Sequence, residues 1–250
     1  MVTFKLDIKQ LKKFIGGWDT SNESLYLHTD SRNDVYLVLF DYNHIYISYL
    51  KIGNTDEFKG TYQLDSFTAD GENDPKTFKK FISKQTTLEL KNNNEKICWI
   101  SNNDVISLYK DSCDLILDLD FFINRSRKEF HLRKQDFKVL ELYKPYNTYL
   151  YFKKGRVEFK IYNERFYVIA KHIICDTYNN QIKEHYNLNN KALLQLLRKF
   201  NSKDEITIKF DDREPLVIQS EDYTGILAPR IIYEEAYGST DGLIDTLGGD

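Results

Sequence analysis

Histidine, cysteine and paired carboxylates are the side chains of this sequence that could bind a metal or carry catalysis. His172 and Cys175 are three residues apart in a strand-like run. A structural zinc site has four ligands, and no second pair completes the set, so burial is the favoured interpretation. Asp118 and Asp120 form an Asp-Leu-Asp sequence with oxygen ligands suited to Mg²⁺. They lie in an expected connector, which is a poor platform for catalysis.

Catalytic motifs are missing from the sequence. It contains no P-loop, no G-x-S-x-G and no G-x-G-x-x-G. We therefore expect no enzymatic activity, no metal and no cofactor. The three cysteines include no C-x-x-C pair and follow no signal peptide, which favours a reducing, intracellular compartment. The longest apolar runs fall far short of a membrane span of about 18 residues, so no membrane partner is expected.

The lysines support a different chemistry, namely ionic contact with a polyanion. They gather in four segments whose apolar residues have helical spacing, at 7–16, 74–85, 133–144 and 189–203. These segments hold fifteen cations and four anions, a net charge of +11, so the rest of a chain with net charge −3 carries −14. In the second segment Lys76, Lys80 and Lys84 follow at i, i+4 and i+8, which places them on one helix face.

Solvation alone explains a polar helix face, and lysine is a good helix former. It does not explain why the acids lie elsewhere, because a mixed-sign face is equally soluble and repels itself less. A face of one sign on every helix indicates a polyanion, most commonly a phosphate backbone. The sequence shows neither aromatics exposed among these lysines nor a helix rich in Asn, Gln and Arg. The expected contact is therefore with the backbone of duplex DNA and independent of base sequence.

The elements that would position these helices repeat along the chain. Phe4, Tyr62, Phe130 and Tyr186 each open an aromatic–any–Leu stretch followed by a lysine-bearing helix, at separations of 58, 68 and 56 residues. Strand-like segments follow each helix, and links of two to four polar residues predict antiparallel hairpins. We therefore predict an α+β fold, with a βαβββ unit repeated four times. Pairs of units would form domains at 1–110 and 129–232, joined by a connector at 111–128.

The final stretch, 233–250, has five acids and no base. A solvated, disordered tail is the expected structure. The alternative is that its GLIDTL segment docks transiently in a pocket of this chain or of a partner.

Four short stretches resemble the DNA sliding clamps, most closely the two-domain homotrimeric type typified by proliferating cell nuclear antigen. They are QLKKFI (10–15), FDYNHIYISYL (40–50), ILDLDFF (116–122) and ILAPRI (226–231). The resemblance spans about residues 1–232. It implies a ring with helices lining the hole and antiparallel sheets outside, which stays on DNA by encircling it.

The resemblance also implies site residues. Lys12, Lys13, Lys80 and Arg198 fall where the family has DNA-facing cations, and helix geometry alone adds Lys9, Lys76, Lys84, Lys134, Lys138, Lys191 and Lys199. A pocket for partner peptides is implied at Asn43, His44, Ile45, Leu117, Leu119, Phe121, Ala228, Pro229 and Arg230. Edge strands for ring closure are implied at Ile106, Leu108 and Lys110, and at Phe166, Val168 and Ala170. Tyr42 and Asn43 stand where the family has two serines, so partner specificity is open.

The expected partners are duplex DNA, a DNA polymerase and other clamp-binding peptides, a clamp loader and further copies of this chain, most simply as a trimer. The chain would act with the replication machinery, in a bacterial cytoplasm, a nucleus or a viral replication site. Two alternatives stay open: a non-encircling accessory factor with the same fold, and a scaffold whose basic helices bind acidic proteins or RNA. The abundance of Lys, Asn and Ile is typical of AT-rich genomes, including viral ones.

Overall fold

A computed structural model describes most of the chain. The described residues are 2–56, 59–64, 74–92, 96–101, 104–109, 111–112, 119, 122, 128–153, 155–163, 167–175, 184–200, 205–211 and 214–228. All statements below concern these residues.

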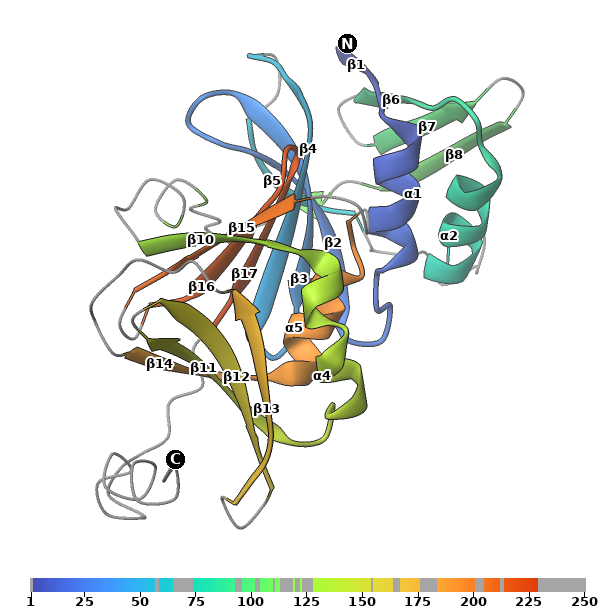
Figure 1. The fold of residues 1–250 in the computed structure, drawn as a ribbon. Coiled ribbons are helices and arrows are strands. Elements are labelled where there is room, and N and C mark those ends of the chain that lie inside the picture. The colour runs from blue at the N-terminus through green and yellow to red at the C-terminus, as the bar shows by residue number, and fades with distance from the viewer. Residues whose placement is uncertain are drawn as a thin grey trace.

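The order of elements repeats four times, as the sequence predicted (Figure 1). Unit one contains β1 (Val2–Lys5), α1 (Ile8–Gly16), β2 (Glu23–Thr29), β3 (Asp34–Asp41) and β4 (Tyr46–Asn54). Unit two contains β5 (Gly60–Gln63), α2 (Pro75–Lys84), β6 (Glu89–Asn92), β7 (Lys96–Ser101) and β8 (Asp104–Tyr109), and the short β9 (Asp111–Ser112) follows. Unit three contains β10 (Lys128–Arg133), a 3₁₀ turn η1 (Lys134–Phe137), α4 (Val139–Leu142), β11 (Asn147–Lys153), β12 (Arg156–Tyr162) and β13 (Val168–Cys175). Unit four contains β14 (Glu184–Leu188), α5 (Asn190–Leu197), β15 (Glu205–Phe210), β16 (Leu216–Gln219) and β17 (Tyr223–Leu227).

The helices begin where their capping residues can accept backbone hydrogen bonds. Asp7 Oδ1 accepts the amides of Lys9 (2.8 Å) and Gln10 (3.2 Å) at the start of α1. Asp74 does the same for α2, whose first residue is a proline that needs no hydrogen-bond partner. The third helix differs from the single one expected over 133–144. It divides into a 3₁₀ turn and four α-helical residues, and bonds from residue i to i−3 precede and close the α-helical part. Pro145 disfavours further extension of the helix.

The strands form three antiparallel sheets in which units exchange their first strands. The order is β1-β6-β7-β8 in one four-stranded sheet and β13-β12-β11-β14 in the other. The nine-stranded sheet has the order β10-β15-β16-β17-β4-β3-β2-β5-β9. Strand β1 therefore joins the sheet of unit two and β5 joins that of unit one, and units three and four exchange β10 and β14 in the same way.

The centre of the nine-stranded sheet is a seam between distant parts of the chain. Strand β17 pairs antiparallel with β4, from Tyr223 opposite Leu50 to Leu227 opposite Tyr46. The last strand of unit four thus continues the sheet formed by unit one. This seam holds the two halves of the chain in one continuous sheet.

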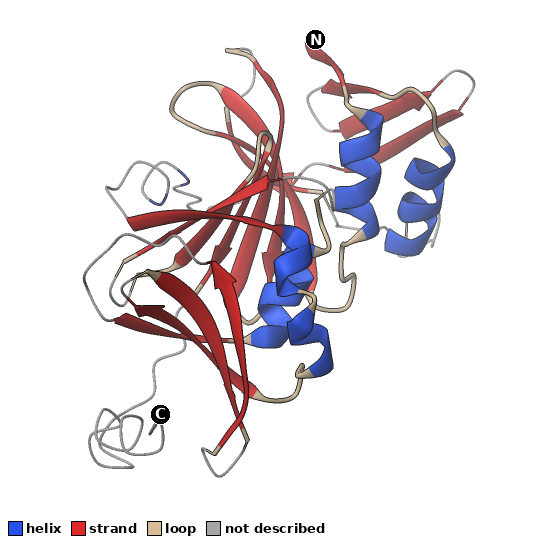
Figure 2. Cartoon of the chain, viewed as in Figure 1, coloured by secondary structure: helices blue, strands red, loops and turns tan. Residues whose placement is uncertain are grey.

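The central strands of the nine-stranded sheet, such as β2, β3 and β17, are buried on both faces, whereas β10 and β15 alternate buried and accessible residues. Successive side chains of a strand point to opposite faces; Leu25, Leu27 and Leu37 point into the main core, which the helices cover. The opposite face carries the outer cluster, defined as Tyr26, Tyr36, Val38, Ile47, Tyr49, Val217 and Ile226 with Leu119 packed among them. Figure 2 shows α1, α2, α4 and α5 together on one side of this sheet. None of them has the length and apolar character needed to cross a lipid bilayer.

Candidate nucleic-acid and partner interfaces

Most of the cations expected to contact phosphate are accessible. Those with exposed side chains are Lys9 and Lys13 on α1, Lys76, Lys80 and Lys84 on α2, Lys138 before α4, and Lys191 and Arg198 at the two ends of α5. Lys12 and Lys134 are half-buried. Because the apolar faces of these helices point into the core, the exposed cations lie on the side away from the sheets.

Helix α2 shows this division most clearly. Phe78 and Ile82 are fully buried, and Phe78 packs against Trp99 with ring centroids 5.0 Å apart. Lys76, Lys80 and Lys84 lie exposed on the other side. Each lies within four residues of the next, so together they form a line of positive charge one helix long.

The ammonium groups of Lys79 and Lys134 form hydrogen bonds within the protein. Lys79 Nζ donates a 2.7 Å hydrogen bond to the carbonyl of Trp18, which ties α2 to the end of α1. Burial lowers the pKa of Lys79, although the charges of Glu23 and Asp19 act to raise it. Lys134 Nζ donates to the carbonyl of Phe200 (2.9 Å) and lies 5.2 Å from the centroid of its ring. Lys134 therefore holds η1 against the end of α5, and only part of its side chain is exposed to solvent.

The prediction that Lys199 contacts DNA is wrong. Its side chain is completely buried and forms an ion pair with Glu23, which is also completely buried. The Lys199 Nζ also donates to Ser48 Oγ (3.1 Å) and lies 4.9 Å from the centroid of the Tyr46 ring. The residue follows α5 on the face that packs against β2 and β4. Its ammonium group therefore binds buried side chains of these strands and does not reach solvent.

Glu23 is held from several sides in this interior site. Its Oε2 accepts the amide of Asp19 (2.6 Å), and its carbonyl accepts Trp18 Nε1 (2.9 Å). Burial lowers the pKa of Lys199, and the charge and hydrogen bond of Glu23 act in the opposite direction. Burial, followed by the charge of Glu23, raises the pKa of Tyr46. A helical projection of the sequence contained a usable signal, because Lys199 lies three residues after Leu196 and seven after Ala192, on the buried face.

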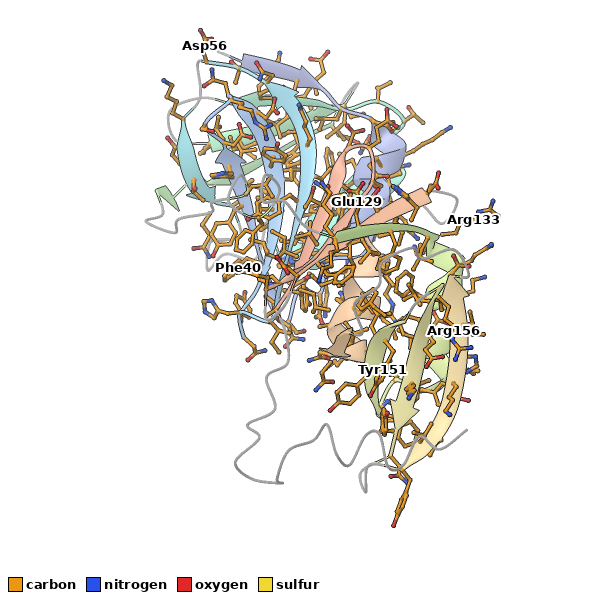
Figure 3. The ribbon with its side chains drawn as sticks, turned by 60° about the vertical axis from the view of Figure 1, so that its left-hand side comes forward. Phe40, Asp56, Glu129, Arg133, Tyr151 and Arg156 are labelled. Carbon is orange, nitrogen blue, oxygen red and sulfur yellow. The ribbon has the colours of Figure 1, made fainter. Side chains whose placement is uncertain are left out.

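The hairpin implied as part of a partner pocket lies beside the end of β17. Asn43 and His44 are exposed in the β3–β4 turn, and Ile45 is half-buried. His44 adopts a left-handed backbone (φ 57°), and its ring meets that of Phe40 edge-on with the ring centroids 5.0 Å apart. Phe40 is labelled in Figure 3. The amide of Ala228 donates to the carbonyl of Ile45 (2.8 Å). The structure thus brings together two segments that the resemblance assigned to one pocket.

The connector contributes Leu119, which is buried in the outer cluster, and Phe122, which packs partly against it. Phe122 is an addition to the implied set. Leu117, Phe121, Pro229 and Arg230 lie outside the described residues, as do Lys110 and Phe166 of the implied edge strands.

The two implied closure strands, β8 and β13, are end strands of their four-stranded sheets among the described residues. Leu108 on β8 is 2% exposed and packs in the main core, so its side chain cannot contact another subunit. Ile106 and Ala170 pack partly against the same core. Val168 packs beside Tyr149, Tyr151 and Tyr162 on the other sheet face. The exposed apolar side chains of these strands are instead Val105, Ile169 and Ile173.

Among the described residues, the metal-ligating residue types do not converge. No group of three or more His, Cys, Asp or Glu side chains suited to a metal is found within the described parts of the chain. The His172 ring lies 5.9 Å from that of Tyr143.

Neither family models nor curated proteins match this sequence. Solved structures of sliding clamps do match its fold. DNA polymerase III subunit beta from Borrelia burgdorferi is 17% identical with a TM-score of 0.69, covering 93% of this chain and 64% of that chain. The Helicobacter pylori beta clamp, solved with a DNA ligase peptide, is 13% identical with a TM-score of 0.66, covering 92% and 65%.

A further match is the PCNA2–PCNA3 complex from Sulfolobus tokodaii, 9% identical with a TM-score of 0.66, covering 92% of this chain and 99% of that chain. The chain thus spans just under two thirds of the two bacterial beta subunits and nearly all of the archaeal protein. The predicted α+β clamp architecture, with antiparallel sheets and few short helices, is confirmed. This chain has the fold of the DNA sliding clamps.

Proposed function

We propose that this protein is a sliding clamp, which encircles duplex DNA as a ring and tethers a DNA polymerase to it. The observation that carries the proposal is the exposed lysine and arginine set of α1, α2 and α5, on the opposite side of the nine-stranded sheet from the outer cluster. Weak ionic contacts with phosphates are independent of base sequence and allow a ring to slide. Topological enclosure then retains the ring without tight binding.

The repeat supports a way of closing the ring. Within the chain, the last strands of units one and four, β4 and β17, join two sheets. The last strands of units two and three, β8 and β13, end the other two sheets in the described structure. Pairing β8 of one copy with β13 of the next would join these sheets in the same manner and satisfy both exposed edges. Three copies, giving six domains, follow from the resemblance to the two-domain clamps.

The partner pocket is the second part of the proposal. The outer cluster, Leu119, the β3–β4 turn and Ala228 lie next to one another, which suits an extended peptide with apolar side chains. A DNA ligase peptide is bound to the similar H. pylori clamp. By analogy, polymerase and other replication proteins would bind this surface, a clamp loader would open the ring, and the protein would act where DNA is replicated inside the cell.

Two measurements test the ring. Light scattering should give a particle of about three times the 29.7 kDa chain. Protein loaded on nicked circular DNA should remain bound at high salt and be released when the circle is cut, because only enclosure retains the protein once salt screens the ionic interactions. A monomer that leaves circular and linear DNA at the same rate would contradict the ring and support a non-encircling accessory factor. A particle that binds RNA or acidic proteins but not DNA would support the scaffold.

A further inference from the structure

A cavity of about 210 Å³ lies where α5 meets the β3–β4 turn and the loop after α1. Three cations line it: Lys191 and Arg198 from the two ends of α5, and Lys144 from the segment after α4. All three side chains are exposed, and no hydrogen bond or ion pair joins them to any residue that the structure describes. Their charge is therefore available to a ligand.

The two carboxylates of the cavity are already engaged. Asp41 is 3% exposed, and its Oδ2 accepts the amide of Ile45 (3.1 Å). Asp19 accepts the amide of Ser21 (3.2 Å) and the side-chain amide of Asn22 (2.8 Å). These bonds fix both acids to nearby backbone or side chains, whereas the three cations reach into solvent. Over all five side chains the cavity has a net charge of +1, and its most exposed charged groups are the three cations.

The chain leaves its last described strand at this cavity. Ile45 lines it, and the carbonyl of Ile45 accepts the amide of Ala228, the last described residue. Glu234 and Glu235 follow six and seven residues later. An extended chain covers at most about 3.3–3.6 Å per residue, so these carboxylates can reach roughly 20 Å from Ala228. The cavity lies well within that range.

The tail, residues 233–250, has the complementary charge, with five acids and no base. We propose that the tail folds back into this cavity and that its first carboxylates, Glu234 and Glu235, pair with Lys144, Lys191 and Arg198. An exposed ion pair is weak. A tethered ligand nevertheless has an effective concentration in the millimolar range, so weak pairs suffice to hold it in place.

Docking of the tail has a consequence that rests on the proposed function. It removes Lys191 and Arg198 from the cations available to DNA, and it covers Asn43 and Ile45 beside the partner pocket. The tail is then an autoinhibitory segment. DNA phosphates compete with it for the same cations, and its release frees both surfaces.

Docking itself is tested without DNA by zero-length cross-linking of the full chain. A carbodiimide joins a carboxyl to an amine that it contacts, and mass spectrometry maps the linked peptides. We expect links from 233–250 to Lys144 or Lys191 within one chain, which mixing isotopically light and heavy chains distinguishes from links between chains. They should disappear in the E234Q/E235Q variant. Tail peptides linked only to lysines outside the cavity, linked only between chains, or not linked at all would overturn the proposal.

The functional consequence is tested on a short linear duplex. Deleting 233–250 should tighten DNA binding by up to about tenfold, the scale of a few exposed ion pairs. The same deletion in the K144Q/K191Q/R198Q variant should have no effect, whereas in the matched K76Q/K80Q/K84Q variant it should still tighten binding. An equal gain in both triple variants would mean that the tail repels DNA without occupying the cavity. Absence of DNA binding in every variant would contradict the clamp function and leave the cross-linking result standing.

Discussion

The ammonium of Lys199 and the carboxylate of Glu23 form a buried ion pair that joins residues 176 positions apart in the sequence. Lys199 follows α5 of unit four, and Glu23 opens β2 of unit one. Ser48 on β4 completes the site by accepting a second hydrogen bond from Lys199. The contact therefore fastens the two halves of the chain directly beneath the cationic surface.

Removing one partner of this pair should be costly. Lys199→Met leaves the Glu23 carboxylate buried without its counter-charge, and such a change typically costs about 3–5 kcal/mol. The free energy of unfolding from urea titration measures the effect. The double variant K199M/E23L should be destabilised much less, because both charges are gone. The exposed Lys191→Met is the control, with a change within about 0.5 kcal/mol, and equal destabilisation by Lys199→Met and Lys191→Met would contradict the burial.

Gly17 should not tolerate a side chain. A Cβ there would lie 2.8 Å from Lys199 Cγ and 3.2 Å from Lys199 Cα, so α1 and α5 would have to separate. Gly17→Ala should lower the free energy of unfolding by about 1–3 kcal/mol. Its neighbour provides the control, because a Cβ at Gly16 meets nothing within 4 Å. Gly16→Ala should be neutral or stabilising through helix propensity, and the opposite order of the two variants would contradict the close approach of the helices.

Capping of α2 should depend on pH. The amide of Thr77, followed by its hydroxyl, holds the pKa of Asp74 below its ordinary value of 3.8. A carboxyl whose pKa is lower in the folded than in the unfolded protein stabilises the fold at pH values above its unfolded-state pKa. This stabilisation is lost as the pH falls through the folded-state pKa. Asp74→Ala should therefore lower the Tm at neutral pH by about 2–4 °C. The difference from the parent protein should shrink below about pH 3.8, and a constant difference down to pH 2 would contradict the cap.

The salt dependence of DNA binding should report the line of lysines on α2. The magnitude of the slope of log K against log salt falls by about 0.9 for each phosphate that the protein no longer neutralises. K76Q/K80Q/K84Q should therefore reduce the magnitude of the slope by up to about 2.7, measured by fluorescence anisotropy on a linear duplex. Lys199→Met, if folded, should leave the slope unchanged, because Lys199 does not reach solvent. A change of slope in that variant would contradict its interior role.

The repeat and the antiparallel hairpins could be predicted because both depend on local patterns. Alternation along a strand, a short polar link and an apolar face at helical spacing each involve residues close in sequence. Leu11, Phe78 and Leu196 are among the apolar residues at helical spacing in the four basic segments, and all three are buried. The four openings at Phe4, Tyr62, Phe130 and Tyr186 lie on β1, β5, β10 and β14.

Non-local features could not be predicted in the same way. Nothing local indicates that β1 pairs with β6, because exchange of first strands depends on how two units pack. The role of Lys199 was missed because its charge was counted by segment, although its own position on the helix points inward. The burial of Leu119 also depends on a surface that five separate strands build. Charge totals therefore located the cationic surface but did not assign every cation to it.

The β4–β17 seam has a consequence for synthesis and refolding. Tyr46 pairs with Leu227, so the central sheet cannot be completed until almost the whole described chain has left the ribosome. Until then β4 presents an unpaired edge rich in apolar residues, the kind of surface through which nascent chains aggregate. Because long-range strand pairing is slow, docking of the last hairpin onto β4 is expected to limit the rate of folding and to set the demand for chaperones.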